Sequence, residues 1–68
     1  MKLNAKKVRL FMARACMKRP DLAKAIGIHE NSLGLIFRRG TAATDTIGRM
    51  ANALGVDVTD ILDDDEVL

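Results

Sequence analysis

The segment GIHENSLGLIFRRG, residues 27–40, places a run of hydrogen-bonding side chains, several apolar residues and an arginine pair within one stretch of helix length. Gly34 interrupts the middle of this stretch, where a glycine costs about 1 kcal/mol of helix stability relative to alanine. Something other than helix propensity must therefore place these side chains.

The chain offers little for covalent or metal chemistry. His29 is the only histidine, Cys16 is the only cysteine, and there is no tyrosine. Paired carboxylates occur only towards the acidic C-terminal end. These counts leave no credible catalytic constellation and no Cys/His metal site. We expect a binding protein with no enzymatic activity and no metal or cofactor, and no small-molecule ligand is evident.

The net charge of +2 conceals a strong asymmetry along the chain. Residues 1–56 hold all eleven Lys and Arg and three acids, a net charge of +8, whereas residues 57–68 hold six acids and no base, a net charge of −6. A basic body of this kind indicates a polyanionic partner. A solvated, lysine-bearing surface is the alternative.

The length of 68 residues allows one small domain. Apolar residues make up 49% of the chain but include only two Phe and no Trp, which favours tightly packed helices. A single cysteine excludes an internal disulfide and fits a reducing cytosol. Arg9 and Arg14 interrupt any signal-peptide core, and no segment has the length of a membrane span. We expect a soluble cytoplasmic protein without membrane association.

Apolar periodicity predicts five short helices and no strand. The first begins after Asn4, a good N-cap, and should stop around residues 16–18, because Pro20 disfavours helical geometry at Arg19. Pro20 suits the first turn of the second helix, which Gly27 should end. The third helix spans His29 or Glu30 to residue 38.

The last two helices follow from capping signals. Thr44 is the expected N-cap of the fourth helix, which Gly55 closes. Asp57 with Asp60 resembles a capping box for a short fifth helix. The apolar residues assigned to the five helices are Val8, Phe11, Met12, Ala15, Leu22, Ala23, Ile26, Leu33, Ile36, Phe37, Ile47, Met50, Ala51, Leu54, Val58, Ile61 and Leu62.

Residues 19–38 have the pattern of two short helices joined by a tight turn. Such a unit needs a small residue where the helices cross and a residue tolerant of positive φ in the turn. Ala23 and Gly27 supply these two. Apolar residues must also fix the second helix on the first, and the candidates are Leu22, Ile26, Ile28, Leu33 and Ile36.

With LAKAIGI at 22–28, the pair Leu33 and Ile36, and MANALGVDVTDIL at 50–62, the sequence resembles the Cro/C1-type helix-turn-helix family, also called XRE-like, of phage repressors and bacterial regulators. The resemblance covers roughly residues 5–62. It implies an all-α, compact five-helix domain of the lambda-repressor-like type over residues 1–62, followed by an acidic tail at 63–68. It also implies that the third helix enters the major groove of double-stranded DNA, usually in a homodimer.

The resemblance further implies which side chains would face base edges. These are His29, Glu30, Asn31, Ser32 and Leu35. Asn31 can pair bidentately with adenine, Glu30 can accept from cytosine N4, and Leu35 could contact a thymine methyl group. Glu30 could instead stabilise the helix dipole, and His29 could be only the N-cap or a solvated turn residue.

By the same resemblance, phosphate contacts would come from Lys18, Arg19, Arg38, Arg39 and Thr41. The family often has glutamine where this chain has Arg19, and an arginine there would deepen the salt dependence. Arg38 and Arg39 could alternatively do no more than compensate the dipole of their own helix.

The sequence departs from the family pattern in two places. Many members pair an arginine in the first helix with a glutamate late in the third, where this chain has Met12 and Phe37; we predict that these two side chains touch. After the third helix the family often has glycine, whereas here Arg39 precedes the glycine by one place. The reach of Arg39 and Thr41 depends on that loop.

The leading hypothesis is a sequence-specific DNA-binding transcriptional regulator, a repressor that occludes a promoter. A homodimer would place its half-sites about 34 Å apart. The alternative is a protein-interaction module, such as an antitoxin whose acidic C-terminal end binds a basic toxin. Residues 63–68 could be a solvated tail or, with the fifth helix, a dimer contact, and they should lie away from the recognition helix.

Overall fold

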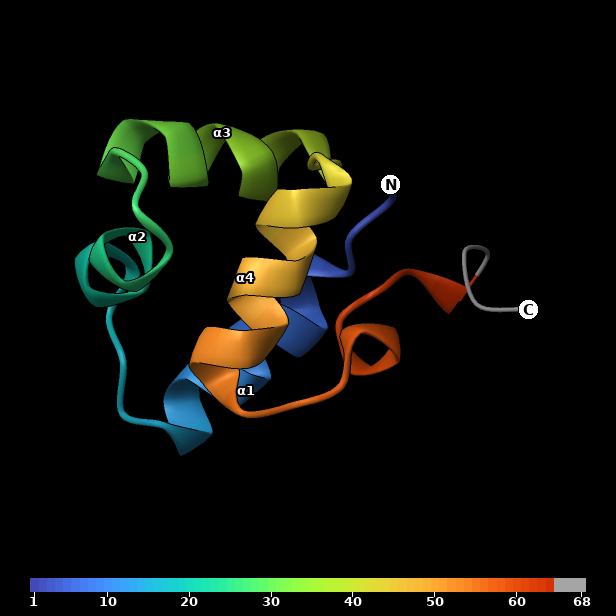
Figure 1. Cartoon of the computed structure of the whole chain (residues 1–68), viewed down its shortest axis with the longest axis horizontal. Coiled ribbons are helices and arrows are strands. Elements are labelled where there is room, and N and C mark those ends of the chain that lie inside the picture. The colour runs from blue at the N-terminus through green and yellow to red at the C-terminus, as the bar shows by residue number, and fades with distance from the viewer. Residues whose placement is uncertain (65–68) are drawn as a thin grey trace.

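The computed structural model describes residues 1–64, which form four α-helices and one 3-10 turn (Figure 1). The elements are α1 (Ala5–Arg14), α2 (Arg19–Ile26), α3 (Glu30–Arg39), α4 (Thr44–Leu54) and η1 (Val58–Asp60). In Figure 1, α4 crosses the centre of the molecule, α3 lies across one end of it, and α2 packs beside both. Within the described part of the chain, no helix is long and apolar enough to cross a membrane.

The prediction of a fifth α-helix was wrong, because that element is a three-residue 3-10 turn. Its capping box is confirmed. The Asp57 carboxylate accepts from Thr59 N at 3.1 Å, and Asp57 N donates to the Asp60 carboxylate at 3.0 Å. The carbonyl of the next residue, Ile61, accepts a hydrogen bond from Asn4 N at 2.9 Å instead of one from a following helical turn.

Most of the predicted helix boundaries are confirmed. Asn4 caps α1 by accepting from Lys7 N at 3.1 Å. Pro20 lies in the first turn of α2, and Gly27 ends that helix with a φ of 75°. Gly55 ends α4 in the same left-handed conformation.

Three boundaries differ from the prediction, and one of them is the end of α3, which lies at Arg39 and not at residue 38. The helix α1 ends at Arg14, earlier than expected, and Cys16 then adopts a φ of 55° that no helix interior allows. The prediction of Thr44 as an N-cap was wrong. Ala43 is the N-cap, since its carbonyl already accepts from Ile47 N at 3.0 Å, and Thr44 is the first helical residue.

The core is a single cluster to which every helix contributes. Ala15 was wrongly assigned to it, because α1 stops before this residue and leaves it exposed. Four other assigned residues, Phe11, Ile36, Leu54 and Val58, are half-buried and pack against the cluster. The buried members are Leu3, Val8, Met12, Leu22, Ala23, Ile26, Leu33, Phe37, Ile47, Met50, Ala51, Ile61 and Leu62.

An extended N-terminal segment, residues 1–4, joins two distant parts of the chain. On one side Leu3 N donates to Gly40 O at 2.8 Å, and on the other Asp63 N donates to Lys2 O at 3.1 Å. Within residues 1–64 these contacts make only isolated β-bridges, so the prediction of no strand is confirmed for that part. The pairing itself was not predicted. It fixes the loop after α3 against the end of the domain.

The described start of the acidic tail lies against this N-terminal region. Asp64 pairs with Lys7 of α1, with Oδ1 and Nζ 3.0 Å apart. The expectations for residues 65–68, as a solvated tail or a dimer contact, lie outside the described residues.

Candidate nucleic-acid interface

The helices α2 and α3 and the turn between them form the unit predicted for residues 19–38. Ile28 N donates to Ala23 O at 3.0 Å, which closes the turn directly after Gly27. Leu22 and Leu33 are fully buried and fix one helix on the other. The outward side of α3 is thereby held at a fixed angle to α2.

The N-terminal end of α3 carries the predicted base-reading residues. His29 is the N-cap, because its Nδ1 accepts from Asn31 N at 3.1 Å, so the other ring nitrogen, Nε2, carries the proton in the neutral ring. Glu30, Asn31 and Ser32 are all exposed. This end of the helix therefore presents amide, hydroxyl and carboxylate groups to solvent.

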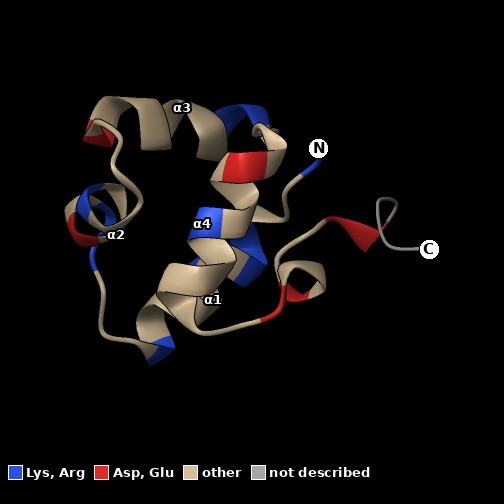
Figure 2. Ribbon diagram, viewed as in Figure 1, with Lys and Arg blue, Asp and Glu red and all other residues tan. Residues whose placement is uncertain are grey.

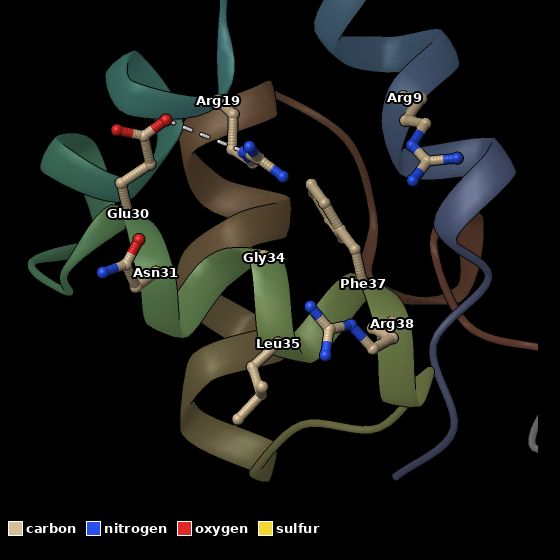
Figure 3. A pocket seen from close by; sticks show the side chains of 8 residues that line it. All are labelled: Arg9, Arg19, Glu30, Asn31, Gly34, Leu35, Phe37 and Arg38. Atoms are coloured by element: carbon tan, nitrogen blue, oxygen red, sulfur yellow. Dashed lines mark ion pairs between the residues drawn. The ribbon is translucent and has the colours of Figure 1, made fainter.

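Glu30 is also an ion-pair partner of Arg19. Glu30 Oε1 lies 3.8 Å from Arg19 Nε, and about half of each side chain is exposed. A pair this long and this exposed contributes little to stability. Two residues assigned to different parts of a DNA interface thus contact each other in the isolated chain (Figure 3).

Arg19 also lies close to Gly34. Its Nη1 lies only 3.3 Å from the position that a Cβ on Gly34 would occupy, which is tighter than most Cβ contacts. The absence of a side chain at Gly34 lets the guanidinium group lie across the middle of α3. The glycine that weakens the helix on propensity thus makes room for a cation.

A surface hollow gathers side chains from three helices and is called the arginine hollow below (Figure 3). Asn31 and Leu35 lie one helical turn apart on its α3 side. Its lining residues are Arg9, Arg19, Glu30, Asn31, Gly34, Leu35, Phe37 and Arg38.

A second, smaller hollow lies beyond Leu35, which borders both. It is lined by Ser32, Leu35, Ile36, Arg39 and Thr41. The structure therefore brings most of the predicted site residues to two adjoining hollows along α3. His29 lies in the turn at one end of α3, and Lys18 is the exposed residue before α2.

The C-terminal end of α3 is basic and firmly held. Arg38 and Arg39 are exposed, and Gly40 ends the helix with a φ of 71° while its N–H donates to Ile36 O at 2.8 Å. The extra residue that separates this chain from the family pattern is accommodated because Arg39 extends the helix before the glycine. Thr41 follows, exposed, and its backbone pairs with Lys2.

Sequence reasoning missed Arg9 of α1. Its Cζ lies 5.6 Å from the centroid of the Phe37 ring, a cation–π distance, and the side chain lines the arginine hollow. The available signal was the unusual Phe37, but a single sequence does not say which side chain covers that ring. Met12 and Phe37 belong to the same core cluster, and their direct contact stays a prediction.

Two short helices crossing over a glycine turn, with the second exposed and flanked by arginines, define a helix-turn-helix domain. The family model for the Cro/C1-type HTH DNA-binding domain matches residues 7–66, and the chain belongs to this family. No curated protein and no solved structure matches the chain significantly. The family is a non-enzymatic DNA-binding one, so the chain is a DNA-binding domain and the predicted fold type is confirmed.

Proposed function

We propose that this protein is a sequence-specific transcriptional regulator that reads double-stranded DNA by placing α3 in the major groove. The observation that carries the proposal is the exposed polar N-terminal end of α3, flanked by Arg19 of α2 and by Arg38 and Arg39. Polar groups at base edges give specificity, and flanking cations give affinity for the phosphate backbone.

Asn31 is the leading candidate for base reading. Its side chain is exposed and makes no hydrogen bond to any residue between 1 and 64, so both its donor and its acceptor are available. That geometry suits bidentate pairing with adenine. Ser32 and Leu35 would extend the reading along the groove, to a base edge and a thymine methyl group. His29 would contribute only through Nε2, and Glu30 only after separating from Arg19.

Phosphate contacts are proposed for the cations at the two ends of α3. Lys18 and Arg19 lie at the start of α2, and Arg38, Arg39 and Thr41 lie at and after the end of α3. Within residues 1–64 neither Arg38 nor Arg39 forms an ion pair, so their charge is not neutralised internally. This supports a phosphate role over simple compensation of the helix dipole.

We propose further that the protein acts as a homodimer and represses by occluding a promoter. One recognition helix contacts only a few base pairs, whereas two copies related by a two-fold axis would read a longer site with half-sites about 34 Å apart. An antitoxin role through the acidic end is less well supported, because Asp64 pairs with Lys7 of the same chain and the arginines gather on the α3 side.

The test is selection of bound sequences from a pool of random duplex DNA. We expect enrichment of a palindrome whose half-sites are about 10 base pairs apart, centre to centre. Binding to the selected site should also weaken steeply with salt. Retention of every duplex equally would contradict sequence reading, and enrichment of a single unrepeated half-site would contradict the dimer.

A further inference from the structure

Three arginines from three different helices line the arginine hollow. Arg9 comes from α1, Arg19 from α2 and Arg38 from α3 (Figure 3). We propose that Arg9, supported by the ring of Phe37, is a further phosphate-binding residue that brings α1 into the DNA contact. This inference rests on the proposed function and adds to it a residue outside the helix-turn-helix unit.

The ring of Phe37 positions Arg9 without neutralising it. The Arg9 Cζ lies 5.6 Å from the ring centroid, and the ring belongs to the core, with only 9% of Phe37 exposed. A cation on an aromatic face is attracted by the ring quadrupole, but the ring carries no net charge. The guanidinium group therefore keeps its full charge and its five donors for a ligand.

Charge in the hollow is strongly unbalanced. Glu30 is the only acid among its lining residues, and it lies 3.8 Å from Arg19. Within the described chain, Arg9 and Arg38 have no carboxylate at ion-pair distance. Three arginines and one carboxylate leave the lining residues with a net positive charge, which favours an anion such as a phosphodiester.

The core holds the helix backbones that carry these arginines in place. Val8 of α1, Leu22 of α2 and Leu33 of α3 are each 0% exposed within the same core cluster. The backbone that carries Arg9 is therefore held in place beside the hollow that Arg38 also lines. A ligand at the hollow would meet a site that is largely formed beforehand.

A second arginine on α1 makes the same kind of contact elsewhere. Arg14 Cζ lies 5.5 Å from the centroid of the Phe11 ring. Neither residue lines the arginine hollow, and α1 runs away from α3 towards Arg14 (Figure 1). Arg14 matches Arg9 in charge, helix and ring contact but not in location, so it is the natural control.

The experiment measures affinity for the selected duplex and for an unrelated duplex by fluorescence anisotropy between about 50 and 200 mM salt. Each phosphate contact contributes about 0.9 to the slope of log affinity against log salt. Arg9→Ala should reduce the magnitude of this slope by about 0.9 on both duplexes. Over the fourfold range of salt, the affinity of the parent should therefore drop by a factor about 3.5 times larger than the affinity of the variant. Arg14→Ala should keep the parental slope.

Two further variants test the part played by the ring. Arg9→Lys keeps the charge and should retain most of the slope. Phe37→Leu keeps an apolar core residue but removes the ring. Arg9→Ala made in the Phe37→Leu variant should therefore change the salt slope by less than Arg9→Ala made in the parent. Thermal unfolding of each variant establishes that it is folded before binding is compared.

Each outcome separates this inference from the proposed function. If the parent binds DNA and Arg9→Ala keeps its slope, Arg9 is not a phosphate contact, although DNA reading by α3 stands. If Arg14→Ala lowers the slope as much as Arg9→Ala, the effect reflects overall charge and the inference is wrong. If the parent binds neither duplex at any salt, the proposed function fails, and this inference fails with it.

Discussion

The two ends of α3 are built in different ways. The N-terminal end is capped locally by His29 and presents Asn31 with no side-chain partner among residues 1–64. The C-terminal end carries Arg38 and is tied to a distant part of the chain through the hydrogen bond from Leu3 N to Gly40 O. Figure 2 shows the acidic residue at one end of α3 and the basic residues at the other.

The difference matches two separate demands of DNA binding. Phosphates lie at regular positions on every duplex, so the groups that grip them work best when the backbone behind them is fixed. Base edges vary with sequence, so the groups that read them must be exposed and unpaired. Under the proposed function, one helix of ten residues would divide the two tasks between its ends.

The largest effect is expected at the C-terminal end of α3. Replacing Arg38 and Arg39 together with Ala should weaken binding to every duplex, since charged hydrogen bonds are worth about 1.5–3 kcal/mol each. The salt slope should fall by about 1.8. The control replaces Arg14 and Arg49, which removes the same charge away from α3. Equal losses in both double variants would remove the special role of this end.

The N-terminal end should respond in the opposite manner. Asn31→Ala should cost about 1–3 kcal/mol of discrimination at one base pair and leave the salt slope unchanged. The measurement compares affinity for the selected site with affinity for single-base variants of that site. Asn52→Ala on α4, which is also exposed, is the control. Unchanged discrimination in Asn31→Ala would mean that another residue reads the site.

A smaller effect is expected in the middle of α3, where a substitution should stabilise the fold. Gly34→Ala should raise the free energy of unfolding by up to about 1 kcal/mol, because alanine favours the helix and the exposed Arg19 side chain can shift by a few tenths of an ångström. Urea unfolding measures the change. Gly48→Ala in α4 is the control, since a Cβ there would meet nothing within 4 Å. Destabilisation by Gly34→Ala alone would show that Arg19 is rigidly held.

The smallest effect concerns the caps. A ring nitrogen caps α3, whereas a carboxylate caps η1, where hydrogen bonds from the Thr59 side chain and backbone lower the pKa of Asp57 below 3.8. The charged carboxylate therefore contributes its full stabilisation of the fold at pH values above 3.8, and this contribution is lost as the pH falls through the lowered pKa. NMR titration of the Asp57 carboxyl group should show the shift. In Thr59→Ala the pKa should move back towards 3.8; an unchanged pKa would contradict this cause.

The parts of the fold that the sequence predicts are those encoded by neighbouring residues. Asn4 as a cap, Gly27 as a stop and the Asp57 capping box each depend on groups within four positions of one another. The crossing of α2 and α3 follows from one small residue and a periodic apolar stripe. These features need no knowledge of the rest of the chain.

The parts that could not be predicted depend on contacts between distant residues. The pairing of Leu3 with Gly40 leaves no periodic pattern in four residues. The support of Arg9 by Phe37 and the position of Arg19 over Gly34 likewise join different helices. The candidate site was therefore predicted as a set of residues on α2 and α3, but the place of Arg9 beside it and the approach of Arg19 to Gly34 were not predicted.

The contacts of the N-terminal segment affect the order in which parts of the fold form. Its bonds to Gly40 and Ile61 join residues far apart in the chain, and contacts of long sequence separation form late in folding. The loop that carries Thr41 thus becomes fixed only when both ends of the domain have met. We expect the Leu3 amide to exchange its hydrogen faster than amides inside α3. Bound DNA should slow that exchange, because it stabilises the state in which the N-terminal segment is paired.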